Sequence, residues 1–332
     1  MKHLNISALN LVPVREGGGV KEAVEDMVSI AQHLDHSSYE RYWIAEHHNT
    51  TTIASSATRQ LIHYVLQHTE NIRVGSGGVM LPNHSPLIVA EEFGTLHAIY
   101  GDRIDIGLGR APGTDMKTAR AIRRNIHDGV FNFDQEISQL RDYLKDDHDG
   151  VIAFPGQGSE IPLYVLGSST DSAFVAAKLG LPYAFAAHFA PQQMRDAFEI
   201  YEREFEPSPQ LNKPYKIACL NVIISDTTED AEHLSTTMKQ FVLNVVRHGR
   251  KKLQPPIDNM DLLWSPYEKS VVESRFPLAI MGDEEVAKEQ LRAFLTQYPV
   301  DEIMVVSYIY DVDKQKQSYD LFAKIVNDIN KQ

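Results

Sequence analysis

The sequence is poor in cysteine, with Cys219 alone among 332 residues. A single cysteine cannot form an intramolecular disulfide, which excludes a disulfide-stapled secreted domain. No apolar run approaches the roughly 20 residues that a membrane-spanning helix needs. The first residues, MKHLNISALNLVPVREGGG, contain neither the apolar region nor the cleavage site of a signal peptide. We therefore expect a cytoplasmic protein that does not enter a membrane.

Basic residues are also in deficit, with 32 lysines and arginines against 45 acidic residues and a formal net charge of −13. Proteins that bind nucleic acid usually present a basic face to the phosphates, so nucleic acid is not an expected partner. Hydrophobic residues make up 43% of the chain, which is enough for a sizeable core. The length fits either two average domains or one large α/β barrel.

Short apolar runs alternate with longer amphipathic segments along the whole chain. The runs that predict strands are residues 3–12, 39–45, 72–80, 103–108, 162–166, 181–187, 215–225 and 301–308. The segments that predict helices are residues 20–36, 55–68, 86–99, 116–145, 171–179, 191–205, 230–248 and 314–329. Residues 249–281 show no periodicity, and we expect an irregular excursion there.

Strands that alternate with helices, without hairpin signals in the first four units, indicate a parallel sheet with helical crossovers. Eight such units predict a (β/α)8 TIM barrel, a single domain over residues 1–332 with insertions after the fourth and seventh strands. A doubly wound open sheet is the alternative. The barrel is favoured because polar or glycine-rich residues end strands two to six, and a barrel brings all these ends to one face.

Glu46, His47 and His48 follow the second predicted strand. Because side chains alternate along a strand, only one of the two histidines can point into the barrel mouth. An imidazole there can donate to an oxygen intermediate or move a proton near neutral pH. A structurally satisfied histidine pair is the alternative.

The glycine-rich segment 75–78 ends the third predicted strand. It is not followed by the Lys-Ser/Thr of a phosphate loop, so a nucleotide triphosphatase is not indicated. Glycines at this position either let a flat ring lie against bare backbone or form a bulge required by packing. The sequence leaves both interpretations open.

Two later segments are candidates for binding an anion. Arg110 follows the fourth strand, where the glycine spacing and Pro112 do not fit a dinucleotide fingerprint. Its guanidinium suits a phosphate or carboxylate, or a structural ion pair. Residues 167–172, GSSTDS, gather amides and hydroxyls at a predicted helix N-terminus, where either a phosphate or a simple N-cap would use them.

The chain resembles the bacterial luciferase-like flavin monooxygenases over nearly its whole length. The resemblance is carried, in order, by YWIAEHHN, IRVGSGGVMLPNHSPLIVAEEFGTL, GDRIDIGLGRAPGTD, LGSSTDSAFVAAKLGLP and MGDEEVAKEQL. It implies a barrel that receives reduced FMN from a separate NAD(P)H flavin reductase. The flavin would react with oxygen to give a C4a-hydroperoxide that oxidises a small organic substrate. Hydride transfer with the deazaflavin F420 and a non-catalytic flavin-binding subunit remain alternatives.

The resemblance also implies roles for individual residues. It makes His47 the catalytic histidine. The residues it assigns to the flavin site are Gly77, Gly78, Arg110, Gly167, Ser168, Ser169, Ser172 and Ala186. The Gly77–Gly78 pair would lie beneath the flavin ring, where relatives often have a cis peptide bond. Arg110 and the serines would bind the phosphate, and Ala186 would lie beside the ring.

Two departures separate this chain from the light-emitting enzymes. Gly109 stands where those enzymes have a reactive cysteine, and Ser168 stands where they have an acidic residue. We therefore do not expect light emission or a long-chain aldehyde substrate. A metal-dependent hydrolase using His47, His48 and His84 is a weaker alternative, because the first strand lacks the paired histidines that such barrels use.

Three further features are predicted. The excursion 249–281 is long and aperiodic, so we expect it to close over the site as a lid. Helices 55–68 and 86–99 carry apolar residues on more than one face, which indicates a homodimer. His188, just after the sixth strand, is expected in the pocket wall, with a solvated loop histidine as the alternative.

Overall fold

The computed structural model describes residues 3–122, 132–146 and 150–332. Its strands are β1 (Asn5–Asn10), β2 (Tyr39–Ile44), β3 (Arg73–Met80), β4 (Ile104–Gly109), β5 (Leu163–Gly167), β6 (Tyr183–Phe185), β7 (Lys216–Ile224), β8 (Ile280–Gly282) and β9 (Glu302–Val306). Its helices are α1 (Val20–Leu34), α2 (Thr58–Gln67), α3 (Pro86–Tyr100), α4 (Met116–Ile122), α6 (Phe133–Leu144), α7 (Thr170–Leu179), α8 (Met194–Arg203), α9 (Thr228–Val246), α10 (Pro266–Glu273), α11 (Glu284–Gln297) and α12 (Val312–Asn330).

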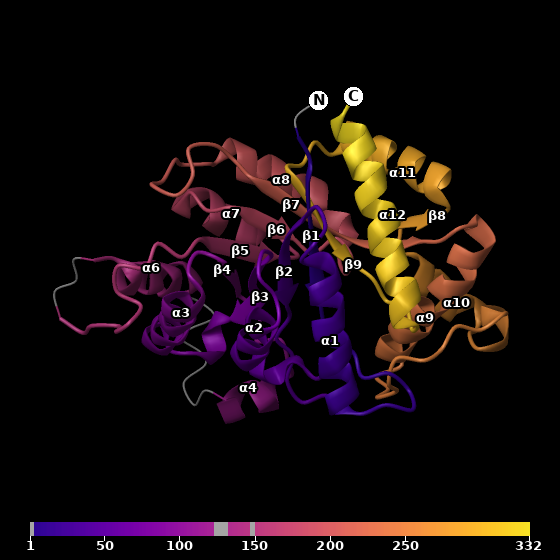
Figure 1. Ribbon diagram of the computed structural model, residues 1–332, viewed down its shortest axis with the longest axis horizontal. Helices are drawn as coiled ribbons and strands as arrows, with labels where there is room; N and C mark the ends of the chain where they lie inside the picture. Colours follow the sequence, from indigo (N-terminus) through magenta and orange to yellow (C-terminus); the bar gives the residue numbers. More distant parts are fainter. Residues whose placement is uncertain (1–2, 123–131, 147–149) are drawn as a thin grey trace.

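The strands form one sheet in the order β6-β5-β4-β3-β2-β1-β9-β7-β8, and an additional pairing of β6 with β7 closes it. Each neighbouring pair is parallel. Helices surround the resulting barrel, while β8 pairs with the last residues of β7 outside the ring (Figure 1). The predicted TIM barrel, with insertions after the fourth and seventh strands, is therefore confirmed, and the open sheet is excluded.

The prediction of an irregular excursion over residues 249–281 was wrong in part. The segment contains α10 and ends in β8, and α11 follows directly as another helix that was not predicted. The start of α10 is a capping box, in which Ser265 Oγ accepts from the Glu268 amide and Glu268 Oε2 accepts from the Ser265 amide. A helix this short shows no clear periodicity of apolar residues, so the capping box was the local sequence signal for this helix. The predicted helix 116–145 corresponds to α4 and α6, and residues 123–131 lie outside the described ranges.

Buried apolar side chains form two layers because side chains alternate along each strand. Tyr42 and Ile44 of β2 point outward and join the larger layer between the strands and the helices. Trp43 points inward and joins the smaller layer that fills the barrel. Cys219 also belongs to this inner layer, where burial raises the pKa of its thiol.

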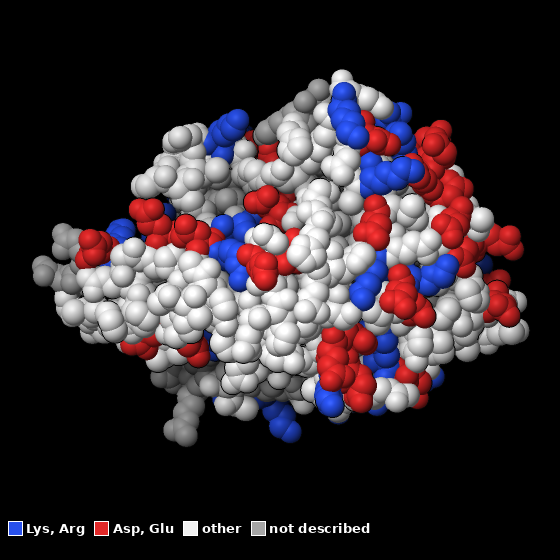
Figure 2. Space-filling model, in the orientation of Figure 1, with Lys and Arg blue, Asp and Glu red and all other residues white. Residues whose placement is uncertain are grey.

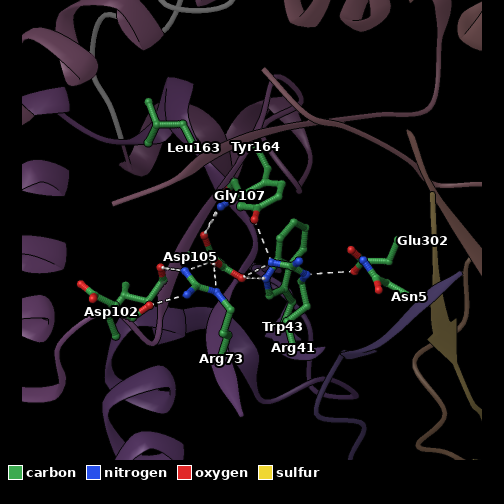
Figure 3. A network of polar contacts seen from close by, with 12 residues as sticks. Asn5, Arg41, Trp43, Arg73, Asp102, Asp105, Gly107, Leu163, Tyr164 and Glu302 are labelled. Atoms are coloured by element: carbon green, nitrogen blue, oxygen red, sulfur yellow. Dashed lines mark hydrogen bonds and ion pairs between the residues drawn. The ribbon is translucent and has the colours of Figure 1, made fainter. Parts of the chain in front are cut away.

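A network of charged side chains crosses the barrel interior near the start of the strands (Figure 3). Arg41 donates from Nε to Glu302 Oε1 and from Nη1 to Asp105 Oδ2, both at 2.9 Å. Asp105 accepts further hydrogen bonds from Arg73 and from Trp43 Nε1, the latter at 3.0 Å. Asp105 and Glu302 are fully buried, so the two arginines supply the charge that compensates them. This network closes one end of the barrel and leaves the carboxyl ends of the strands for a site.

The surface carries charges of both signs in the view of Figure 2, with fewer over α2 and α3 than over α11 and α12. Tyr64, Ile88 and Ile99 are exposed on α2 and α3. The homodimer predicted through these helices stays a prediction. Across the described ranges, no helix combines the length and apolar character that crossing a bilayer requires.

Candidate functional site at the barrel mouth

The carboxyl ends of the parallel strands meet at one face of the barrel. Glu46, His47 and His48 follow β2, the Gly77–Gly78 pair lies in β3, and Arg110 follows β4. Residues 168–169 follow β5, and residues 186–188 follow β6. The structure therefore brings the predicted site residues from five successive strands to one rim.

Glu46 organises the histidines at the end of β2. It is 2% exposed, and its Oε1 accepts hydrogen bonds from Nε2 of His48 and of His84, each at 2.8 Å. Its Oε2 accepts from the Met80 amide at 3.1 Å. Burial, the largest single effect, raises the pKa of Glu46, but the hydrogen bonds from His48, His84 and the Met80 amide, with the electrostatic attraction of His84, together outweigh it and lower that pKa to about 2. Glu46 is therefore ionised at neutral pH and acts only as an acceptor.

The same three groups lie close enough together to hold a metal ion. Two imidazoles and one carboxylate are a set that catalytic zinc sites use. However, Arg59 Nη2 lies 3.5 Å from His84 Nδ1, and a guanidinium can only donate. Nδ1 of His84 is therefore the acceptor, and Nε2 carries the proton that Glu46 accepts. This tautomer and the nearby positive charge both disfavour a cation, and His47, which the hydrolase alternative needs, is not among the three groups.

His47 has surroundings that differ from those of its neighbour His48. Burial lowers the pKa of His47, although a hydrogen bond with the Gly113 backbone acts in the opposite direction. The imidazole is thus neutral at pH 7 and can take up or release a proton. His48 is turned to Glu46, whereas the hydrogen bond that acts on His47 is with the Gly113 backbone, so the two histidines have different partners.

The Gly77–Gly78 peptide bond is cis, the form implied by the resemblance. A Cβ atom on Gly77 would lie 2.5 Å from Leu9 Cδ1 and 3.1 Å from Trp43 Cβ. A Cβ on Gly78 would lie 2.8 Å from the carbonyl oxygen of Gly107. The ladder between β3 and β4 also shifts register here. Gly78 is therefore required by packing against the Gly107 backbone, whereas the closest contact at Gly77 is the end of a flexible leucine side chain. Packing, one of the two interpretations left open, thus accounts for Gly78.

Arg110 reaches the turn that precedes α7. Its Nη2 donates to Asp171 Oδ2 at 3.0 Å, and Asp171 lies in the first turn of that helix. Ser168 and Ser169 are partly exposed in the same turn, with Ser169 as the N-cap residue. Hydroxyls, backbone amides and a guanidinium therefore converge at a helix N-terminus, an arrangement that suits a phosphate.

The remaining predicted residues shape this turn. The Ser172 hydroxyl is buried, donates to the Ser169 carbonyl and lies 2.9 Å from the Tyr183 hydroxyl, so it is engaged inside the protein. A Cβ on Gly167 would lie 1.7 Å from Ser172 Oγ, which explains the glycine. Ala186 donates its amide to the Gly167 carbonyl at 2.8 Å. These contacts join the ends of β5 and β6, while Ser168 and Ser169 remain partly exposed.

The sequence reasoning missed two polar residues at the mouth. Glu46 was noted only as a neighbour of the histidines, although its carboxylate holds both His48 and His84. Asn221 was not singled out, although it lies in β7 among apolar neighbours, KIACLNVII, and is 2% exposed. A lone amide in a fully buried strand is a signal that the sequence did contain.

Replacing Glu46 by glutamine tests this arrangement. We expect a loss of about 1–3 kcal/mol in the free energy of unfolding at pH 7, because the ionised acceptor of two histidines is removed. The folded-state pKa of Glu46 is about 2 and the ordinary pKa of a glutamate side chain is 4.5, so the stabilisation is complete above pH 4.5 and is lost as pH falls toward 2. Urea unfolding of wild type and variant from pH 7 to pH 3 measures the difference. The exposed Glu40→Gln is the control, and a Glu46→Gln difference that stays constant over this range contradicts the assignment.

Comparisons with known proteins identify the family of the chain. Residues 5–302 match the family described as luciferase-like monooxygenase. The chain is 45% identical to the uncharacterized protein YddN of Bacillus subtilis, covering 100% of this chain and 98% of that protein. It is 42% identical to a luciferase-like monooxygenase of Escherichia coli, covering 99% and 98%. It is 28% identical to the N-acetyl-S-alkylcysteine monooxygenase of Bacillus subtilis, covering 97% and 98%.

Solved structures share the barrel fold of this chain. Apo-MsnO8 matches with a TM-score of 0.87 and 32% identity, covering 98% of this chain and 99% of that one. The FMN complex of the oxygenating constituent of 3,6-diketocamphane monooxygenase from Pseudomonas putida matches with a TM-score of 0.72, 17% identity and 98% coverage of both chains. An F420-dependent secondary alcohol dehydrogenase matches with a TM-score of 0.64, 15% identity and the same coverage. The last two share the fold alone. Because the family match covers most of the barrel and full-length relatives exceed 40% identity, this chain belongs to the luciferase-like monooxygenase family.

Proposed function

We propose that this protein is a monooxygenase that uses reduced FMN and molecular oxygen to oxidise a small organic substrate. The observation that carries the proposal is that one barrel mouth combines the neutral imidazole of His47 with the anion-binding turn beside Arg110. Family membership supports the reaction class. The N-acetyl-S-alkylcysteine and FMN-bound relatives support a small substrate and FMN.

In this proposal Arg110 and the turn before α7 bind the flavin phosphate. Ser168, Ser169 and the free amides at the start of α7 add donors for its oxygens. The ring then lies over the Gly77–Gly78 pair and beside Ala186. When bound, reduced FMN would supply the chemistry with oxygen, and the protein would contribute orientation and exclusion of water.

His47 is the residue proposed to act on the reacting groups. One side of its imidazole is held by the Gly113 backbone, and the neutral ring can hold or release a proton at pH 7. Glu46 acts as a positioning residue, since it fixes the chain on both sides of His47 through His48 and His84.

The test is anaerobic titration with reduced FMN, followed by stopped-flow mixing with oxygenated buffer, for wild type and His47→Ala. We expect reduced FMN to bind both proteins and the oxygenated flavin to decay about 10- to 100-fold faster in the variant, because a positioned proton donor or acceptor is lost. The exposed His36→Ala should behave as wild type. Absence of reduced FMN binding refutes the proposal. Binding of F420 in its place then indicates hydride transfer, and binding of neither indicates a non-catalytic role.

The excursion 249–281 is proposed to act as a lid over the mouth. Leu253 pairs with Arg15 after β1, and Arg275 lies 6.0 Å from the ring of Phe189 after β6. The excursion thus contacts two loops of the rim. We expect FMN to slow limited proteolysis within it, and equal cleavage with and without FMN contradicts a lid. The flavin reductase and the homodimer stay predictions alongside it.

A further inference from the structure

The loop between β4 and α4, residues 110–115 and here called the β4 loop, is attached at two points to the segments that follow other strands. Asn83, which follows β3 and is 5% exposed, donates from Nδ2 to the Pro112 carbonyl at 2.8 Å. Asn49, which follows β2, donates from Nδ2 to Asp115 Oδ2 at 2.9 Å. The part of the loop between these two points is therefore held from both sides.

Gly113 lies at a point of close approach between the β4 loop and the end of β2. Its φ is +62°, in the left-handed region that favours glycine, and a Cβ atom there would lie 2.9 Å from the carbonyl oxygen of Glu46. The next residue, Thr114, donates from Oγ1 to the His48 carbonyl at 3.3 Å. Glu46 and His48 are the chain neighbours of His47. The β4 loop thus contacts the backbone on both sides of His47.

The loop also contacts the ring of His47. Burial lowers the pKa of His47, and a hydrogen bond with the Gly113 backbone raises it. A bond that raises the pKa of an imidazole is one in which a ring N–H donates, so the acceptor is the Gly113 carbonyl. In the neutral ring the other nitrogen then carries no proton. The Gly113 carbonyl consequently selects one of the two tautomers of His47.

The residues that attach the loop to the end of β2 suit this task. Asn49 has a φ of +54°, a conformation that asparagine adopts more readily than most residues with a side chain. Asp115 also accepts from the amide and the hydroxyl of Thr118, at 3.0 and 2.9 Å. The hydrogen bonds from Asn49 and Thr118 lower the pKa of Asp115, so its carboxylate is ionised at neutral pH and acts only as an acceptor. The attachment point at Asp115 is therefore itself held by α4.

We propose that Asn83 and Asp115 are positioning residues for His47. Together they hold the β4 loop against the segments that follow β2 and β3. The Gly113 carbonyl then keeps one ring nitrogen of His47 protonated and leaves the other for the reacting groups. The part played by reacting groups rests on the proposed function. The attachment of the loop rests only on the contacts described above.

The 15N chemical shifts of the histidine rings test the attachment in the flavin-free protein at pH 7. A single tautomer gives one protonated and one unprotonated nitrogen with well-separated signals, and a mixture of tautomers brings the two signals together. We expect Asp115→Ala and Asn83→Ala each to change the tautomer ratio of His47 by about 3- to 10-fold, since one hydrogen bond is worth about that factor. His47→Ala identifies the signals that belong to His47.

The exposed position of Asp115 makes its variant the deciding one. Unchanged His47 signals in Asp115→Ala overturn the proposal. Asn83 is buried, so thermal unfolding is used to report whether Asn83→Ala is folded.

Two substitutions control for charge and for the start of α4. Asp115→Asn removes the same charge but keeps a side-chain oxygen that can accept from Asn49, so it should retain the wild-type tautomer ratio. Thr118→Ala removes only a hydroxyl that Asp115 accepts within α4, and it should also behave as wild type. Equal changes in Asp115→Ala and Asp115→Asn indicate an effect of charge and overturn the proposal.

The stopped-flow experiment with reduced FMN separates this proposal from the proposed function. Asp115→Ala should speed the decay by about 3- to 10-fold, less than His47→Ala does, because the imidazole is misplaced and not removed. A wild-type decay in Asp115→Ala overturns the positioning role. Failure of reduced FMN to bind contradicts the proposed function. The histidine spectra need no flavin and still decide whether the β4 loop holds His47, so the two failures are distinguishable.

Discussion

Replacing Arg41 by methionine is expected to lower the free energy of unfolding by about 3–5 kcal/mol, the largest effect that we predict on stability. Arg41 lies between two fully buried carboxylates, Asp105 and Glu302, and donates to each at 2.9 Å. The variant keeps a similar volume but leaves one arginine, Arg73, for two carboxylates. Taking an unpaired charge out of water is costly, so the folded state loses most of its compensation at Glu302.

Urea unfolding at pH 7 measures this loss, with Arg203→Met as the matched control. Arg203 pairs with Glu204 at 2.7 Å, but its side chain is 63% exposed. Exposed pairs contribute about 0–1 kcal/mol, so the control should unfold close to wild type. If Arg41→Met loses no more stability than Arg203→Met, the buried network does not stabilise the barrel in the way that its geometry indicates.

Opposite substitutions at Arg110 and Asp171 are expected to change FMN affinity in opposite directions. Arg110→Ala removes a charge-assisted donor from the proposed phosphate site, and we expect binding about 10- to 100-fold weaker. Asp171→Asn removes a carboxylate that now holds the guanidinium and would repel a phosphate. This second change should strengthen binding by about 2- to 10-fold. The opposite signs distinguish a phosphate site from a purely structural ion pair.

Fluorescence titration with oxidised FMN measures both affinities. Asp142→Asn, which removes another exposed carboxylate paired with a lysine, controls for the general loss of negative charge. Its affinity should equal that of wild type. Changes of the same sign in Arg110→Ala and Asp171→Asn, or equal gains in the two aspartate variants, contradict the placement of the phosphate at this turn.

The fold was largely predictable from the sequence, for a physical reason that its parts share. A strand in a parallel barrel is buried on both sides, so apolar runs such as residues 72–80 and 301–308 identify it locally. Eight runs separated by amphipathic helices leave few arrangements other than a barrel. Three elements were not predicted. β8 and α10 are too short to show a clear periodicity of apolar residues, and the helical pattern of α11 was overlooked. The shorter β6 reflects an early turn, where the Ala187 amide donates back to the Phe185 carbonyl.

The site was predictable only in outline. Residue type and position after each strand pointed to His47, to the Gly77–Gly78 pair and to Arg110. The sequence alone could not decide whether those glycines serve a ligand or the packing. The contact with the Gly107 backbone, on another strand, shows that packing requires Gly78.

By itself, then, the sequence determined the order of the strands and helices, the absence of disulfides and the residue types at the mouth, because these follow from local periodicity and composition. Only the tertiary structure decided which groups meet. Arg41 and Glu302 are 261 residues apart, and Glu46 and His84 are 38 apart, yet each pair shares a hydrogen bond. Such pairs form because closing the barrel buries their charges, and a buried charge is stable only where a partner from another strand reaches it.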